Sequence, residues 1–139
     1  MAAFNKFNDF VEQIGKAIHD LDGTHTLKVM LTNTAPLATN SVKTDLTEIA
    51  AGNGYTAGGT ATTPTWSETS GTAKLVCTDV VFTASGGTIG PFQYAVLYND
   101  TAASDNLIGF WNYGSAVTLQ DTETFTVDFD GTNGVLTIS

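Results

Sequence analysis

The sequence contains no arginine, and its five basic residues are all lysines, against fourteen acidic residues and a formal net charge of −9. Proteins that bind nucleic acid need cationic patches for the phosphates, and they rely on arginine above all to read base edges. An acidic chain is also repelled by an anionic membrane surface. We therefore expect neither nucleic acid nor membrane among its partners.

Cysteine is nearly absent, and long apolar runs are missing. Cys77 is the only cysteine, so the chain can form no internal disulfide and no thiolate cluster for zinc. Because it follows Leu75 and Val76, we expect a buried structural thiol. The first residues lack the apolar stretch of a signal peptide, and no segment approaches the roughly 18 apolar residues of a membrane span. We expect a protein that is neither exported by a standard signal nor embedded in a membrane.

Side chains suited to catalysis are equally sparse. Only His19 and His25 could serve as the usual general base, and we place His19 on the polar side of a helix and His25 just before a strand. Asp128 and Asp130 alternate with apolar residues, which predicts a solvated strand face and no acid/base pair. We expect no catalytic residues, no cofactor and no bound metal, and hence no enzyme.

The segment 128–134 has a faint likeness to a calcium loop, since Asp128 and Asp130 stand two residues apart with glycines nearby. In the loop of an EF-hand the sixth position is Gly and the twelfth is Glu, whereas here they are Asn133 and Ser139. We interpret the segment as a hairpin turn. A cation at Asp128 and Asp130 is the alternative.

The residues that are abundant indicate a folded chain. With 139 residues, 42% of them hydrophobic, the chain can bury a core of its own. Only 14% of the residues are charged, so the surface must be largely Thr, Ser, Asn, Gly and Ala. We predict a single domain over residues 1–139.

The first element is predicted to be an amphipathic helix over residues 4–22, ended by Asp22 and Gly23. Its stripe is too short, and its flanks hold too little charge, for a coiled-coil stalk. We favour an apolar face packed on a sheet of the same or a neighbouring subunit. The apolar residues recur at spacings of three and four: Phe4, Phe7, Val11, Ile14, Ile18 and Leu21.

Apolar residues then recur at every second position, which predicts a half-buried strand over residues 25–32 with Leu27, Val29 and Leu31 on its covered face. Met30 and its alternating neighbours form the other face.

In residues 33–59 the apolar side chains follow neither the helical nor the strand spacing. They include a possible short helix, in which Asp45 and Glu48 are spaced as in a capping box, and two glycine clusters. Irregular segments of this length are typical of functional loops. We predict a long surface arm, which serves either as a contact arm to neighbouring molecules or as an ordinary crossover.

The rest of the chain alternates between strand patterns and turn residues at short intervals, which is typical of a sandwich or barrel. We predict a mainly β fold, an antiparallel β-sandwich or a jelly-roll or barrel-like domain with one N-terminal helix. Residues 92–98 and 107–113 are expected to pair as a central hairpin. The predicted strands of this β-rich core (60–139, together with 25–32) are 62–67, 73–78, 80–84, 92–98, 107–113, 124–130 and 135–138.

Several blocks of the sequence resemble a family of small proteins of tailed phages and prophages. Together they extend over nearly the whole chain. The first half contributes LKVMLTNTAP (27–36) and LTEIAAGNGY (46–55), and the second half contributes SGGTIGPF (85–92), YAVLYND (94–100), LIGFW (107–111) and FTVDF (125–129).

The resemblance implies a virion component, and we expect a decoration (cement) protein that stabilises the capsid at capsomer junctions. It would be made in the host bacterial cytoplasm and be located on the outer capsid surface. Its expected partners are the major capsid protein and further copies of itself, as a dimer or trimer. Many weak contacts repeated by symmetry suit a polar β surface with little charge.

The arm and the helix are the elements most able to reach a neighbour, so the contact residues are sought mainly there. A tail- or fibre-associated protein is one alternative. A carbohydrate-binding module is another, because Trp66, Tyr55 and other aromatic residues could form a stacking platform. The expected contact residues are Phe4, Phe7, Val11, Ile14, Leu37, Leu46, Ile49, Tyr55 and Trp66.

Overall fold

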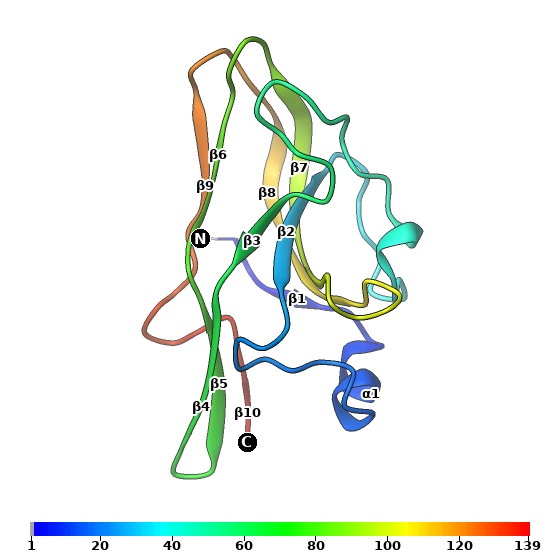
Figure 1. Cartoon of the computed structure of the whole chain (residues 1–139), viewed down its shortest axis with the longest axis vertical. Helices are drawn as coiled ribbons and strands as arrows, with labels where there is room; N and C mark the ends of the chain where they lie inside the picture. The colour runs from blue at the N-terminus through cyan, green and yellow to red at the C-terminus, as the bar shows by residue number, and fades with distance from the viewer. Residues whose placement is uncertain (1) are drawn as a thin grey trace.

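The computed structural model describes residues 2–139, and it is mainly β, as the alternating patterns predict. All strand ladders in this part of the chain are antiparallel, and they form sheets of five, three and two strands (Figure 1). This arrangement is consistent with a β-sandwich. The elements are β1 (Asn5–Lys6), α1 (Phe10–Gly15), β2 (Leu27–Thr32), the 3-10 turn η1 (Lys43–Asp45), β3 (Thr60–Thr62), β4 (Pro64–Thr69), β5 (Thr72–Cys77), β6 (Val80–Thr83), β7 (Ile89–Asn99), β8 (Leu107–Leu119), β9 (Thr124–Val127) and β10 (Leu136–Ile138).

The five-stranded sheet has the order β1-β8-β7-β2-β3, and the smaller sheets are β10-β5-β4 and β6-β9. The predicted central hairpin is confirmed, because β7 and β8 pair along most of their length. Strand β2 lies beside β7, with Leu27 opposite Asn99 and Thr32 opposite Tyr94. Strands β2, β7 and β8 therefore occupy the middle of the sheet.

Both faces of this sheet are buried. Leu27, Val29 and Leu31 belong to a main core between the five-stranded sheet and the smaller sheets. Met30 belongs to a second core on the opposite face, and both Met30 and Thr32 are fully buried. The prediction that this strand is half-buried was wrong, because irregular segments of the chain cover the face that a sequence pattern assigns to solvent. The buried residues of the second core are Phe7, Met30, Val96, Tyr98 and Leu107.

The predicted helix over residues 4–22 shrinks to the six residues of α1. Ahead of it, Asn5 and Lys6 pair with Phe110 and Gly109 as a short edge strand. A side chain on Gly109 would overlap the ring of Phe4, so this glycine lets Phe4 lie across β8. Behind α1, Ala17 takes a left-handed conformation at φ 59°, which ends the helix. The apolar stripe is real, but burial against separate partners outweighs helical propensity.

The segment 128–134 is not a hairpin turn. Strand β9 pairs with β6, whereas β10 pairs with β5 in another sheet, so the segment crosses between two sheets. Sequence patterning identifies the strands on either side but not their partners.

The single cysteine lies in the interior, at the end of β5. Cys77 is buried, as predicted, and its burial raises the pKa of the thiol to about 12. Within residues 2–139, no helix has both the length and the apolar character required to cross a bilayer.

Candidate functional site

The structure separates the nine expected contact residues into buried and accessible groups. Phe7 is fully buried and Tyr55 is 2% exposed, so neither side chain is available to a partner, and both must be removed from the set. Leu46 packs at the margin of the second core, while Ile49 and Trp66 pack at the margin of the main core. Four residues remain as candidates: Val11 and Leu37 are exposed, whereas Phe4 and Ile14 are partly buried, with Ile14 also at the margin of the main core.

Three of these four residues line one apolar groove between α1 and the C-terminal strand β10. Phe4, Val11 and Ile14 form part of its wall, and Ile138 contributes from β10. The groove has a volume of about 690 Å³. Val11 is 59% exposed and Ile138 is 43% exposed, which is costly for apolar side chains in water. Sequence reasoning found the helix side of the groove but missed β10, because a pattern cannot show which strand will lie beside α1.

Leu37 is not among the lining residues of this groove. It is 62% exposed, and the loop that carries it is tied to the N-terminal segment by a hydrogen bond from the Asn8 backbone nitrogen to the Ala38 carbonyl oxygen (2.9 Å). The start of the arm therefore meets the N-terminal segment just ahead of α1.

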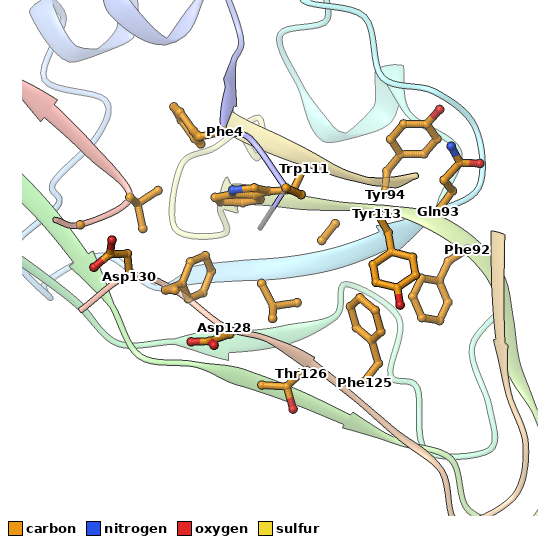
Figure 2. Close-up of a pocket in the computed structure, with 16 residues that line it drawn as sticks. Phe4, Phe92, Gln93, Tyr94, Trp111, Tyr113, Phe125, Thr126, Asp128 and Asp130 are labelled. Carbon is orange, nitrogen blue, oxygen red and sulfur yellow. The ribbon is translucent and has the colours of Figure 1, made fainter. Parts of the chain in front are cut away.

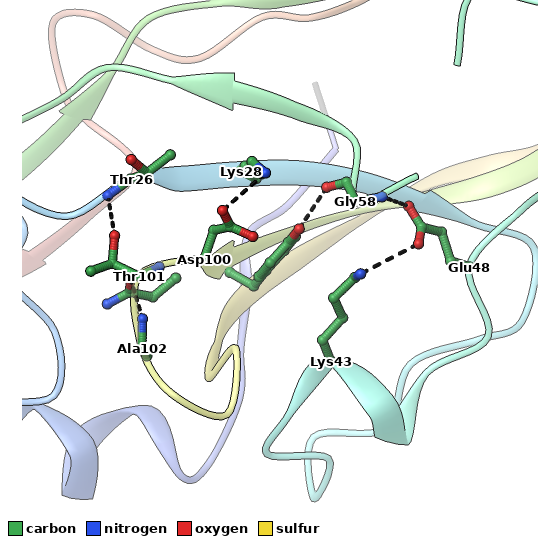
Figure 3. Close-up of polar contacts among 10 residues, drawn as sticks. Thr26, Lys28, Lys43, Glu48, Gly58, Asp100, Thr101 and Ala102 are labelled. Carbon is green, nitrogen blue, oxygen red and sulfur yellow. Dashed lines mark hydrogen bonds and ion pairs between the residues drawn. The ribbon is translucent and has the colours of Figure 1, made fainter. Parts of the chain in front are cut away.

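The arm itself is not free to reach out. The Glu48 carboxylate accepts hydrogen bonds from the Tyr55 hydroxyl (2.7 Å) and the Gly58 backbone nitrogen (2.6 Å), and it pairs with Lys43 at 3.5 Å. The Tyr98 hydroxyl donates to the Gly58 carbonyl oxygen (2.7 Å) from the second core (Figure 3). These contacts hold residues 43–58 over the sheet, whereas Leu37 lies in an exposed loop ahead of them.

The prediction that Asp45 and Glu48 form a capping box was wrong, because the short helix η1 ends at Asp45, which caps it from the third position. The Asp45 carboxylate accepts hydrogen bonds from the backbone nitrogens of Ser41 (2.8 Å) and Val42 (3.2 Å), and these bonds lower its pKa. Glu48 instead anchors the arm through Tyr55 and Gly58.

A second cavity, which we call the aromatic slot, opens between the five-stranded sheet and β9. Trp111 and Tyr113 project into it from β8, and Phe125 and Phe129 line it from the opposite layer (Figure 2). Its volume is about 380 Å³, within the usual range for ligand pockets. Tyr113 is 58% exposed at its opening.

The rings of the slot stand at steep angles to one another. Trp111 meets Phe129 at 67° and Phe4 at 56°, with centroids 5.4 Å and 5.3 Å apart. Tyr113 meets Phe125 at 74°. Edge-to-face packing of this kind holds aromatic rings in fixed orientations, so the slot has walls in several planes.

The charged groups beside the slot are acidic. Asp128 and Asp130 are among its lining residues, and none of the described lining residues is basic. Asp130 accepts hydrogen bonds from Asn133 and from the backbone nitrogen of Thr132, which lower its pKa, and nearby Lys74 adds to that effect. Asp128 is exposed, and its carboxylate has no hydrogen-bond partner among residues 2–139.

The alternative of a cation at Asp128 and Asp130 gains no support from this geometry, because the Asp130 carboxylate is directed into its own turn. Among the described residues, no three His, Cys, Asp or Glu side chains gather as a group that could hold a metal ion.

Asn99 is fully buried at the end of β7, and both histidines lie beside it. We call these three residues the Asn99 cluster. The Asn99 amide nitrogen lies 3.2 Å from His19 Nδ1 and 3.0 Å from His25 Nδ1, while its oxygen accepts from the backbone nitrogens of Thr101 and Ala102. The same amide nitrogen lies 3.2 Å from the Ile18 carbonyl oxygen, so its two hydrogens are shared among three contacts with the N-terminal region. His19 is 8% exposed, which corrects its placement on a polar face.

The environment of His19 disfavours its charged form. Burial is the main cause, and neighbouring His25 adds to it, so that the pKa of His19 falls to about 4. Its Nε2 atom is buried without a hydrogen-bond partner in the described part of the chain. The contacts of His19 with the Asn99 amide and the Phe10 ring give it a place in the packing between the N-terminal region and β7.

Comparison with known proteins gives no relative: no protein-family model, no curated protein and no solved structure matches this chain.

Proposed function

We propose that this chain is a non-enzymatic structural protein of a tailed-phage particle, which decorates and stabilises the capsid by binding the major capsid protein at capsomer junctions. The observation that carries the proposal is the apolar groove between α1 and β10, with Val11 and Ile138 exposed along it. The resemblance of the sequence blocks to small phage proteins supports the setting, and the groove supplies a surface for binding.

The free energy available from the groove is that of a weak contact that is repeated many times. Burying one of these exposed apolar side chains contributes roughly 1.5–3 kcal/mol, so a groove with Val11 and Ile138 gives a modest interaction per copy. Closed symmetry and many copies on one shell multiply such contacts without a large interface on each subunit. Self-association as a dimer or trimer belongs to the same proposal.

A tail- or fibre-associated protein would use the same surface, and location on the particle separates the two. Cryo-electron microscopy of the particle that carries this chain should show stoichiometric density on the outer capsid lattice. Density confined to the tail would replace the capsid assignment with the tail alternative.

A matched pair of variants tests whether the groove makes the contact. Val11→Asp places a charge in the groove, and Val81→Asp places the same charge on β6, where Val81 is exposed to a similar degree (51%). Because a buried, unpaired carboxylate is strongly unfavourable, Val11→Asp should lower co-sedimentation with shells at least tenfold. Val81→Asp should bind as the unaltered chain does. Equal binding by both variants would exclude the groove as the docking surface.

A further inference from the structure

We propose that the aromatic slot is a binding site for a trimethylammonium group, the methylated cation of choline and of trimethyllysine. The inference rests on the slot between β8 and β9, which shares Phe4, alone among the described lining residues, with the groove that carries the proposed function.

The shape of the slot favours a round ligand. Its rings meet at 56° to 81°, so they form walls in several planes around a space of about 380 Å³. A sugar ring stacks on one broad aromatic face and needs polar groups around it for its hydroxyls. Walls at steep angles instead surround a compact tetrahedral group on several sides, which is how aromatic cages hold methylated ammonium ions.

The charge around the slot selects a cation. The faces of Trp111 and Tyr113 are electron-rich, and Asp128 and Asp130 add carboxylates among the lining residues. Lys74 lies near Asp130 and donates to the Thr132 carbonyl oxygen (2.7 Å), so the exposed Asp128, at the edge of the slot, is the carboxylate whose charge attracts a cation from outside the aromatic walls. An anionic ligand would meet no basic residue among the described lining residues, on a chain of net charge −9.

The polarity of the slot disfavours a sugar. Its inner wall includes Val127 and Phe129, which are 9% and 7% exposed, and Figure 2 shows Thr126 pointing away from the space. Sugar hydroxyls that lie against these two apolar side chains would lose hydrogen bonds to water without replacement. A trimethylammonium group presents methyl groups to the walls and is only weakly hydrated for a cation, so it loses far less.

Fluorescence titration can test the site on the full chain. The sequence has two tryptophans, so a Trp66→Phe background leaves Trp111 as the only reporter. Choline should quench its fluorescence in a saturable way with a dissociation constant of roughly 1 mM, the affinity expected of a few cation–π contacts. Sodium chloride keeps the ionic strength constant. N-acetyl-trimethyllysine amide distinguishes a peptide source from a small-molecule source, according to which of the two binds more tightly.

Three comparisons decide the chemistry. The neutral isostere of choline, 3,3-dimethylbutan-1-ol, should bind at least fivefold more weakly. Equal or tighter binding would overturn the cation assignment in favour of an apolar ligand. Saturable quenching by methyl glucoside at similar concentrations would overturn it in favour of a sugar site, and no saturable quenching by any probe would remove the slot as a site.

Two variants with a matched control locate the effect. Asp128→Asn should weaken choline binding about fivefold, as expected for one carboxylate near the cation at a protein surface. Tyr113→Ala, at a residue that is 58% exposed, should weaken it further. Asp105→Asn makes the same charge change in the β7–β8 loop and should leave binding unaltered. Equal weakening by Asp128→Asn and Asp105→Asn would mean that choline responds to net charge and not to this slot.

Discussion

The two faces of the five-stranded sheet are both buried, but they are covered by different kinds of structure. The smaller sheets cover the main core, where residues such as Leu31 and Leu75 are held by apolar packing. The N-terminal segment and the arm cover the second core, and polar anchors at Glu48 and Tyr98 hold the arm in place. An irregular segment can therefore act as a structural layer when a few buried hydrogen bonds fix its backbone.

The largest expected effect comes from shortening one residue on each face. Leu31 and Met30 are adjacent, both fully buried, and directed into opposite cores. Leu31→Ala should lower the free energy of unfolding by about 3–4 kcal/mol, and Met30→Ala by about 2–3 kcal/mol, since an irregular cover can relax around the cavity. Urea denaturation measures both. A loss below about 0.5 kcal/mol for Met30→Ala, the size of a surface substitution, would show that the arm does not cover this face.

Acid should weaken the end of the sheet where the Asn99 cluster joins β7 to the N-terminal region. The pKa of His19 is about 4 in the folded chain, against 6.5 for an unperturbed histidine side chain. The unfolded chain therefore binds a proton first, so the stabilising contribution is complete above pH 6.5 and is lost as the pH falls towards 4. Between about pH 7 and about pH 4.5 the loss should be about 2 kcal/mol.

His19→Gln removes this titration and is the control for carboxylates that titrate in the same range. Its free energy of unfolding should change less over the same pH interval than that of the unaltered chain. Parallel pH profiles for the two proteins would contradict the assignment to His19.

The smallest effect tests one anchor of the arm. Tyr98→Phe removes the hydrogen bond to the Gly58 carbonyl oxygen and should lower the free energy of unfolding by about 1 kcal/mol. Tyr94→Phe is its control, because the Tyr94 hydroxyl has no hydrogen-bond partner in residues 2–139 and the side chain is only partly buried. Equal stability of the two variants would mean that apolar packing alone holds the arm.

Much of the β structure could be predicted from local patterns. The predicted strands at 73–78 and 80–84 match β5 and β6 within a residue or two, and the central hairpin pairs as expected. Alternation works there because one face of each strand packs against the main core. It fails at Met30, because Phe7 and Leu46 reach the second core from irregular segments whose position no local pattern predicts.

The candidate surfaces divide in the same way. Val11 and Ile14 could be found from the apolar spacing of the N-terminal region. Ile138 could not, because the position of β10 beside α1 depends on the order of strands in the three-stranded sheet. The aromatic slot was hidden for the same reason. Trp111 and Phe125 belong to different sheets, and no sequence pattern places them opposite each other.

The sequence by itself determined the acidic charge, the mainly β class, the buried thiol of Cys77 and most of the strands, because each depends on composition or on neighbours along the chain. Only the tertiary structure decided the length of the helix, the burial of Tyr55 and His19, the fixed position of the arm and the two cavities. Those features depend on contacts between residues far apart in the sequence, where the burial of apolar surface and of hydrogen-bonding groups outweighs local preference.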